Sequence, residues 1–295
     1  MILGLGDIGY KVAFGDACDL IGRFWELGGR EFDTAHTYAH WVPGMLGSSE
    51  RTLGAALRTL GIPSDEARVM TKGGHPHTGP LYPRPERYLA PDLLRQDLEE
   101  SLERLGLDRV DTFLLHRDDP SVPIEEIAAL LQDLRSAGLV RRAGVSNWPL
   151  QRVAELRARL EGELAWQNQC SLAAPNWQEG PDPTMRRFKA GDFVWASGSD
   201  VACSCYSSSA NGFFATGGEG GAFDNAESRL RLNRARRLAE ARAVTPSQIA
   251  LAWVAAQPGD VSPVIGTTTI SHLEDAMASS AVDLSPEERD WLGMP

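Results

Sequence analysis

Four polar side chains of complementary chemistry follow apolar segments in the first half of the chain. FDTAHTYAH carries Asp33 and Tyr38, TKGG carries Lys72, and LLHRDD carries His116. A phenol has a pKa near 10, and a neighbouring ammonium group favours the phenolate and lowers that pKa. A carboxylate can hold the ammonium group in place, while a histidine can hydrogen-bond a reacting oxygen. The four side chains together suit protonation of a carbonyl oxygen while hydride reaches its carbon.

Each of the four residues also has an ordinary structural interpretation. Asp33 could cap a helix, Tyr38 could be a surface aromatic residue, Lys72 could be a solvated charge and His116 could be a core histidine. Either interpretation fits a single residue taken alone. Because all four follow expected strands, the functional interpretation explains more of the sequence.

A second possible motif stands at the beginning of the chain. Residues 4–9, GLGDIG, fit the dinucleotide-binding spacing G-x-G-x-x-G. That motif needs a full strand before it and a helix that opens directly after it. Here only three residues come before it, and the helical pattern begins near Asp16. We therefore interpret GLGDIG as the first strand and its turn, with small residues that permit close approach to a ligand.

Apolar segments and helical patterns alternate along the whole chain. The strand-like segments span residues 1–6, 30–35, 67–73, 110–117, 141–148, 164–172, 200–208 and 262–269. Eight strands alternating with helices predict a parallel (β/α)8 TIM barrel, which we expect to form one domain over residues 1–295. Chemistry in such barrels lies at the carboxyl ends of the strands, so the four polar residues should share one face.

Helical periodicity varies in strength along the chain. One clear face is formed by Leu94, Leu98, Leu102 and Leu105, which recur at helical spacing and should be buried. The sixth helix is hard to find within residues 173–200. The glycine-rich stretch within residues 207–228 predicts a loop at the active face.

Composition excludes several classes of protein. The net charge of −11 argues against a general nucleic-acid surface or an anionic membrane surface. No apolar run approaches the roughly 20 residues of a membrane span, and no basic signal-peptide region precedes the first apolar segment. The scattered cysteines are Cys18, Cys170, Cys203 and Cys205. Scattered cysteines indicate reduced thiols, so we expect a cytoplasmic protein. From the net charge we expect no nucleic-acid or membrane partner.

The histidines and cysteines do not predict a metal site. His36, His40, His75 and His77 lack a partner at ligand spacing. Cys203 and Cys205 lie two residues apart on an expected strand, but two ligands do not complete a site. We therefore expect no metal cofactor.

The order of the motifs resembles a known enzyme family, the aldo-keto reductases. From residue 2 to about residue 292, the chain carries FDTAHTYAH, SSERTLGAAL, TKGG, FLLHR, GVSN, QNQCSL, YSSSANGFF and PVIGTTTISHLEDA. The Asp-x-x-x-x-Tyr spacing, followed by Lys and His on later strands, is the specific part of the resemblance. HRDDP after the fourth strand makes the chain most similar to bacterial members.

The resemblance implies a role for each of the four polar residues. Tyr38 would be the general acid in reduction and the base in oxidation. Lys72 would lower the pKa of the phenol, and Asp33 would pair with Lys72. His116 would orient the carbonyl group. The implied activity is reduction of an aldehyde, ketone or sugar carbonyl by NADP(H) or NAD(H).

The resemblance also implies a nicotinamide cofactor site. Its residues would be Ser146, Asn147 and Gln169 at the carboxamide, Tyr206 under the ring, and Gly266, Thr267, His272 and Asp275 along the adenosine end. Many NADP-dependent members carry Lys and Arg where this chain has Gly266 and His272, and those cations grip the 2′-phosphate. NADP(H) remains the first expectation, with NAD(H) as the alternative. Because the first strand is expected to begin at residue 2, we expect the N-terminal hairpin that is common in the family to be missing.

The substrate pocket and two other function classes stay open at this point. Trp41, Trp148 and Phe213 could form an aromatic substrate pocket at the mouth of the barrel, or they could cover the barrel rim. The barrel could instead be a non-catalytic nicotinamide-cofactor-binding module, against which the intact Tyr38 and Lys72 argue. It could also be a cofactor-free isomerase or hydrolase, which would have no use for the cofactor residues.

Overall fold

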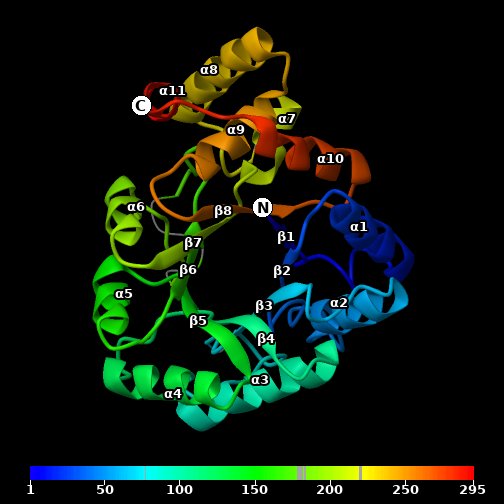
Figure 1. Ribbon diagram of the computed structural model, residues 1–295, viewed down its shortest axis with the longest axis vertical. Coiled ribbons are helices and arrows are strands. Elements are labelled where there is room, and N and C mark those ends of the chain that lie inside the picture. The colour runs from blue at the N-terminus through cyan, green and yellow to red at the C-terminus, as the bar shows by residue number, and fades with distance from the viewer. Residues whose placement is uncertain (77, 178–181, 183, 219–220) are drawn as a thin grey trace.

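The computed structural model describes residues 1–76, 78–177, 182, 184–218 and 221–295. Within these residues, eight parallel strands close into one barrel in chain order (Figure 1). The strands are β1 (Ile2–Gly4), β2 (Glu31–Asp33), β3 (Arg68–Gly73), β4 (Val110–Leu115), β5 (Val140–Ser146), β6 (Leu164–Gln169), β7 (Val201–Tyr206) and β8 (Val261–Gly266). The barrel closes where Gly4 lies opposite Gly266. The expected (β/α)8 TIM barrel is therefore confirmed, and GLGDIG is its first strand and turn.

Helices surround the barrel on its outside (Figure 1). Those between successive strands are α1 (Phe14–Glu26), α2 (Ser48–Thr59), α3 (Pro91–Leu105), α4 (Ile124–Ser136), α5 (Leu150–Arg157) and α6 (Ala190–Ser197). Between β7 and β8 lie η1 (Ala210–Gly212), α7 (Phe213–Thr216), α8 (Ala226–Arg242) and α9 (Pro246–Ala255). After β8 come α10 (Ile270–Ala278), η2 (Ser279–Ala281) and α11 (Pro286–Gly293). α8 and α11 pack together beyond α9, outside the ring of helices (Figure 1).

Helix α3 shows how the sequence pattern produces the packing. Its four periodic leucines, Leu94, Leu98, Leu102 and Leu105, are all buried. Pro91 occupies the first turn, where a missing N–H costs little. The helix ends at Gly106, whose φ of 69° lies in the left-handed region that favours glycine. The predicted buried face is confirmed.

The second half of the chain differs from expectation in two segments. α6 covers only eight residues, and its buried apolar residues are Phe193 and Ala196. A helix this short carries little periodic signal. Residues 207–228 hold η1, α7 and the first residues of α8, so they are not a continuous loop. Of the two weak segments, residues 178–181, 183 and 219–220 lie outside the described residues.

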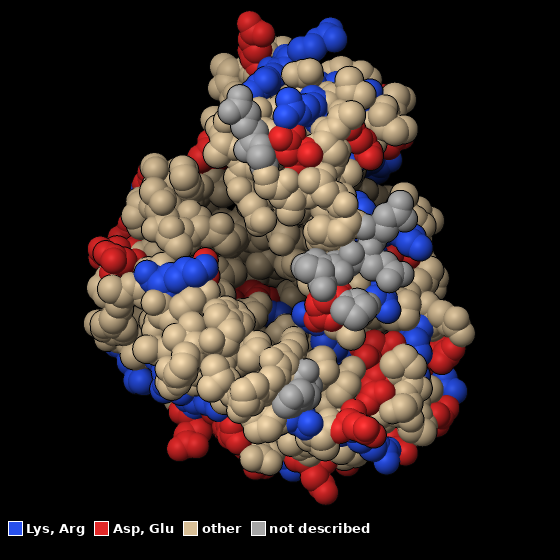
Figure 2. All heavy atoms as spheres, turned by 180° about the vertical axis from the view of Figure 1, so that it is seen from behind, with Lys and Arg blue, Asp and Glu red and all other residues tan. Residues whose placement is uncertain are grey.

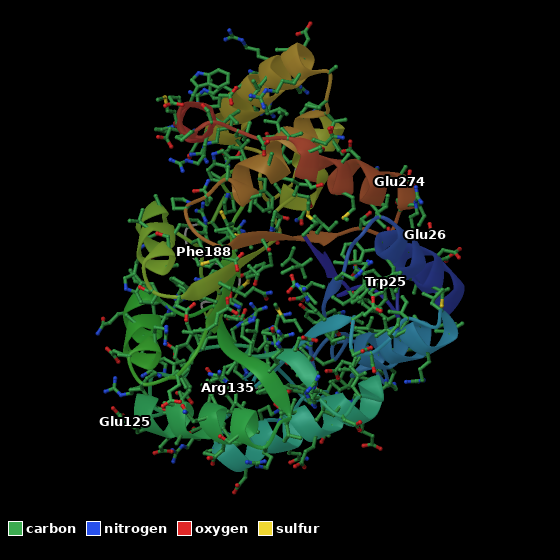
Figure 3. All side chains as sticks on the ribbon, viewed as in Figure 1. Trp25, Glu26, Glu125, Arg135, Phe188 and Glu274 are labelled. Atoms are coloured by element: carbon green, nitrogen blue, oxygen red, sulfur yellow. The ribbon has the colours of Figure 1, made fainter. Side chains whose placement is uncertain are left out.

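The first and last helices of the ring meet through an ion-pair cluster. Arg23 of α1 contacts Glu274 of α10 at 2.8 Å and Glu26 at 3.0 Å. Figure 3 shows Glu26 and Glu274 close together at this contact. All three side chains are more than a third exposed, so each pair contributes at most about 1 kcal/mol. Burial of neighbouring apolar residues such as Ile21 and Leu273 contributes more to this packing.

The barrel interior holds a small apolar core. Its buried residues are Ile2, Met70, Leu114, Ala165 and Val264. A cavity of about 560 Å³ lies at the amino ends of the strands, beside Met70 and Ala165.

Figure 2 shows the face of the molecule that lies behind the view of Figure 1, and this face is hollowed near its centre. No described helix is long and apolar enough to cross a membrane.

Candidate active site

Residues at or just after the ends of β2 and β3 form one hydrogen-bonded cluster. Lys72 Nζ lies 2.6 Å from Asp33 Oδ1 and 2.9 Å from Tyr38 OH. It also donates to the carbonyl oxygen of Thr34 at 2.9 Å. Tyr38 OH lies 3.3 Å from the same Asp33 oxygen. The structure thus brings three of the four predicted residues together around one ammonium group.

The register of β2 and β3 places this cluster. Asp33 lies opposite Met70, and Lys72 follows Met70 by two residues, on the same side of its strand. Because Met70 belongs to the core inside the barrel, Lys72 also points inward. Asp33 is 2% exposed and Lys72 is 1% exposed. Two charges this deeply buried are tolerated only because they are paired and hydrogen-bonded.

His116 joins the cluster from the next strand. Its backbone N–H donates to the carbonyl oxygen of Gly73 at 2.7 Å, directly after β4. Its Nδ1 lies 3.3 Å from the Thr37 hydroxyl, and its ring centroid lies 6.1 Å from that of Tyr38. With the Thr37 hydroxyl donating to Nδ1, the proton of the neutral ring lies on Nε2. His116 Nε2–H can then donate to an oxygen that also contacts Tyr38.

Burial sets the protonation states of these groups. Burial raises the pKa of the Tyr38 phenol above its usual value, although the Lys72 ammonium opposes this. Burial lowers the pKa of Lys72, but Asp33 and Tyr38 together hold that pKa above its usual value. Burial and the charge of Arg117 keep the pKa of His116 well below its usual value. The phenol and ammonium are therefore protonated at neutral pH, and the imidazole is neutral.

The effect of Lys72 on the pKa of Tyr38 has the expected direction, but burial opposes it. The Lys72 ammonium acts in the predicted direction. Desolvation of the phenolate is the larger effect, because Tyr38 is packed into the barrel mouth. The net result is a phenol that holds its proton at neutral pH.

Gln167 belongs to the cluster, although the sequence analysis missed it. Its Nε2 donates to Asp33 Oδ2 at 2.6 Å, so each carboxylate oxygen has a donor. Gln167 and Gln169 lie two residues apart on β6 and therefore share a face. That spacing in LAWQNQ was the available signal. Thr37, which orients His116, was missed in the same way.

The residues expected at a nicotinamide carboxamide lie on neighbouring strand ends. Asn147 adopts a φ of 62°, and its Nδ2 donates to Ser146 Oγ at 3.0 Å. Its Oδ1 accepts from Tyr206 OH at 2.7 Å. Gln169 donates through Nε2 to Ser171 Oγ, while its Oε1 is buried without a hydrogen-bond partner among the described residues. The structure brings these four predicted residues together.

The residues expected at the adenosine end are arranged differently. Gly266 at the end of β8 and His272 on α10 are exposed. Thr267 Oγ1 donates to the backbone carbonyl of Thr269 at 3.2 Å. Asp275 accepts from Gln248 Nε2 at 2.7 Å, so its carboxylate joins α10 to α9. Only part of this predicted set is open to a ligand.

The three aromatic residues proposed for a substrate pocket are not brought together. Trp41 is 51% exposed and meets the Tyr10 ring edge-on at 5.7 Å. Trp148 is 0% exposed, so it lies in the core and lines no open pocket. Phe213 is buried in a separate apolar cluster with Phe214. Trp41 alone remains at an exposed edge.

The remaining histidines and the cysteines form no metal site within the described part of the chain. His36 Nε2 lies 2.8 Å from Glu100, and His40 Nδ1 lies 2.9 Å from the Thr37 carbonyl oxygen. His77 lies outside the described residues. No described group of three or more His, Cys, Asp or Glu side chains could hold a metal ion. All four cysteines are free thiols.

Known proteins resemble this chain in sequence and in fold. The sequence model of the Aldo/keto reductase family matches residues 1–291. An uncharacterized oxidoreductase of Mycobacterium bovis is 31% identical over 307 residues, covering 98% of this chain and 83% of that protein. An aldo-keto reductase of Alternaria alternata is 28% identical, covering 92% and 80%. A crystal structure of a thermostable aldo-keto reductase with the inhibitor epalrestat shares the fold, with a TM-score of 0.75 at 22% identity, covering 99% and 93%.

Proposed function

The chain belongs to the aldo/keto reductase family, and on this premise we propose that it uses a nicotinamide cofactor to reduce an aldehyde, ketone or sugar carbonyl to the alcohol. The observation that carries the proposal is the buried cluster of Asp33, Lys72 and Tyr38. A protonated phenol held by an ammonium group can supply a proton to a developing alkoxide. A buried ion pair is costly to build, which favours a chemical role over a packing role.

Each residue of the cluster has a task in the proposed reaction. Tyr38 holds the proton on its hydroxyl oxygen and gives it to the substrate carbonyl oxygen. Lys72 Nζ, at 2.9 Å, stabilises the phenolate as it forms. Asp33 keeps the ammonium group in place, and His116 Nε2–H donates to the same carbonyl oxygen and orients it. The cofactor, when bound, supplies the hydride.

The residues at the ends of β5, β6 and β7 fit a nicotinamide group. Gln169 Oε1 is a buried acceptor without a partner among the described residues, and a carboxamide N–H would satisfy it. The Ser146 hydroxyl and the Asn147 amide stand at the neighbouring strand end. Tyr206 offers an aromatic ring held through its hydroxyl. These groups would bind and orient the nicotinamide.

The choice between NADP(H) and NAD(H) depends on the segment after β8. The amino terminus of α10 favours a bound phosphate, because its first N–H groups are unpaired. Gly266 and Thr267 bring no cation to a 2′-phosphate. NADP(H) is the first candidate on family grounds, and NAD(H) is the alternative that these neutral residues support.

Two measurements test the proposal. The first is titration of the protein with NADPH and with NADH, followed by tryptophan fluorescence. The second is the Tyr38→Phe variant, which should bind cofactor and lose carbonyl reduction at least about 100-fold. Tyr88→Phe is the matched control, because the Tyr88 hydroxyl donates to the Asp118 carbonyl oxygen and bonds none of the four catalytic candidates. It should keep the activity.

Three outcomes would contradict the proposal. Failure to bind either cofactor at millimolar concentration would leave the family membership as ancestry only. Cofactor binding without turnover of any carbonyl compound would favour a non-catalytic cofactor-binding barrel. Full reduction by Tyr38→Phe would exclude this phenol as the proton donor.

A further inference from the structure

His75 lies beside His116 but has no task in the proposed reaction. It follows the turn at Gly74, whose φ is 68°, directly after β3. Its ring meets the His116 ring edge-on, with centroids 4.9 Å apart and planes at 81°. The side chain is buried, with 7% of the residue exposed. A polar ring is therefore packed against the residue that would orient the substrate carbonyl.

The hydrogen bond of His75 fixes which nitrogen carries its proton. Nδ1 lies 3.1 Å from the carbonyl oxygen of Pro76. A carbonyl oxygen can only accept, so the proton lies on Nδ1 and Nε2 carries a lone pair. Burial, and next the charge of Arg117, lower the pKa of His75 to about 4. The ring is therefore neutral at pH 7, and Nε2 is a hydrogen-bond acceptor.

That acceptor is unused. Among the residues that the structure describes, none hydrogen-bonds His75 Nε2. This nitrogen also does not belong to the polar side-chain atoms that are fully buried without a partner. Two nearby histidines differ, because both nitrogens of His36 and both of His40 have partners. An accessible acceptor on a ring that is otherwise buried can take a hydrogen bond from a ligand.

The two neighbouring rings present opposite groups. His116 presents a donor, Nε2–H, in the tautomer in which the Thr37 hydroxyl donates to its Nδ1. His75 presents an acceptor, Nε2, because Pro76 occupies its Nδ1. A carbonyl oxygen needs a donor, and a hydroxyl group can satisfy an acceptor. Rings 4.9 Å apart can serve two oxygens carried on adjacent carbon atoms.

We propose that His75 Nε2 accepts a hydrogen bond from a hydroxyl group on the carbon next to the substrate carbonyl. This inference rests on the proposed function, because it places the carbonyl oxygen between Tyr38 and His116. It narrows the substrate class to 2-hydroxy aldehydes and 2-hydroxy ketones, the class that includes sugars. His75 is thus a specificity-determining residue. A substrate without the hydroxyl leaves Nε2 unpaired, which lowers kcat/KM.

The test compares two aldehydes that differ by one hydroxyl group, 2-hydroxypropanal and propanal. The wild-type protein should favour 2-hydroxypropanal in kcat/KM by about tenfold, the value of one neutral hydrogen bond. His75→Phe keeps an aromatic ring but has no acceptor, so this preference should disappear. His75→Gln carries an acceptor oxygen at a similar reach and should retain part of the preference. The readout is the ratio of the two kcat/KM values in each variant.

The ratio separates this role from a structural one. If His75→Phe lowers kcat/KM equally for both aldehydes and keeps the ratio, His75 only packs against His116 and the inference is overturned. A wild-type protein that reduces both aldehydes with equal efficiency overturns the inference and leaves the proposed function standing. A wild-type protein that reduces neither aldehyde but reduces another carbonyl compound with NADPH or NADH also overturns the inference and leaves the proposed function standing. A protein that reduces no carbonyl compound overturns the proposed function, and the inference with it.

Discussion

Two regions at the carboxyl ends of the strands are built in opposite ways. In the cluster of Asp33, Tyr38 and Lys72, the polar groups bond one another, and Lys72 is 1% exposed. In the segment after β8, Gly266 and His272 are exposed. The first region has its geometry fixed by the protein itself. The second offers surfaces whose contacts a ligand would have to complete.

This difference predicts different consequences of mutation. Removing one partner of a buried ion pair leaves an uncompensated charge, which costs about 3–5 kcal/mol. Substitutions at exposed positions usually change stability by less than about 0.5 kcal/mol. Changes in the cluster should therefore alter folding and reaction together. Changes in the segment after β8 should alter cofactor affinity alone.

The largest effect is expected from Lys72→Met. Methionine keeps an unbranched side chain but removes the ammonium group, so the Asp33 carboxylate stays buried without its partner. We expect the free energy of unfolding to fall by about 3–5 kcal/mol. Carbonyl reduction should fall at least about 100-fold, because the phenolate loses its stabilising charge. Urea denaturation measures the first effect, and steady-state kinetics measures the second.

A double variant separates the two effects of Lys72→Met. Asp33→Asn combined with Lys72→Met removes both charges, so most of the stability should return while activity stays low. Lys11→Met is the matched control, because Lys11 pairs with Asp7 at the surface and its side chain is 61% exposed. It should change neither quantity measurably. Equal losses from Lys11→Met and Lys72→Met would remove the contrast between buried and exposed charges.

The second largest effect is expected from acidification, which should lower the free energy of unfolding through the buried His75. His75 has a pKa of about 4 in the folded protein, set mainly by burial, against about 6.5 in an unfolded chain. Between these pH values the unfolded state binds more protons, so stability is lost as the pH falls from about 6.5 toward 4. His75 alone should contribute a loss of about 2 kcal/mol between pH 6.5 and pH 5.

The measurement is the urea midpoint at pH 7 and at pH 5. His75→Gln removes the titrating ring, so it should lose less stability than the wild type over this interval. His116, whose pKa is also lowered by burial, remains in both proteins and cancels in the comparison. The same loss in both proteins would mean that His75 does not resist protonation in the fold.

The sequence predicted the parts of the fold and site that follow from strand order. Alternating apolar and helical segments predicted the barrel, and a barrel requires its strand ends to meet at one face. Lys72 and His116 were therefore identifiable from position alone. Asp33 and Tyr38 followed from the same reasoning, because both come at or just after the end of β2.

The site predictions that were wrong or incomplete concern side-chain burial and contacts, which the sequence does not state. Trp148 follows a strand end as the catalytic candidates do, yet its ring turns into the core and is 0% exposed. The direction of the Tyr38 pKa shift balances burial against Lys72, and only the structure gives the burial. Gln167 was missed although it shares a face of β6 with Gln169, because the sequence does not show that its side chain reaches Asp33 on another strand.

A smaller effect is expected from a neutral member of the cluster. Gln167→Leu removes the hydrogen bond of 2.6 Å to Asp33 Oδ2 without removing a charge. We expect kcat to fall about tenfold and the free energy of unfolding to fall by about 1–3 kcal/mol, because one buried carboxylate oxygen loses its donor. Kinetics and urea denaturation measure the two quantities.

The control for Gln167→Leu is Gln257→Leu. Gln257 Nε2 donates to the Trp253 carbonyl oxygen at 3.0 Å, far from the cluster in the chain and without a charged partner. This control should leave kcat unchanged. A kcat that is insensitive to Gln167→Leu would show that Lys72 alone holds Asp33 in its reactive position.

The smallest effect is expected in the segment after β8, where Gly266→Lys and His272→Arg should change cofactor choice. A Cβ on Gly266 would meet no heavy atom within 4 Å, and His272 is exposed, so both new side chains have room. A cation placed there can form a charge-assisted hydrogen bond with the 2′-phosphate of NADPH. We expect each variant to lower the Kd for NADPH by about tenfold, which equals about 1.4 kcal/mol.

Parallel titrations with NADPH and NADH measure this change, with His272→Gln as the uncharged control. The Kd for NADH should stay the same, because NADH lacks the 2′-phosphate, and the urea midpoint should stay the same, because neither position is buried. A gain that is equal for both cofactors would mean that the cation attracts the shared pyrophosphate. A fall in stability comparable with that of Gln167→Leu would mean that the segment after β8 is part of the folded framework, and the contrast between the two regions would fail.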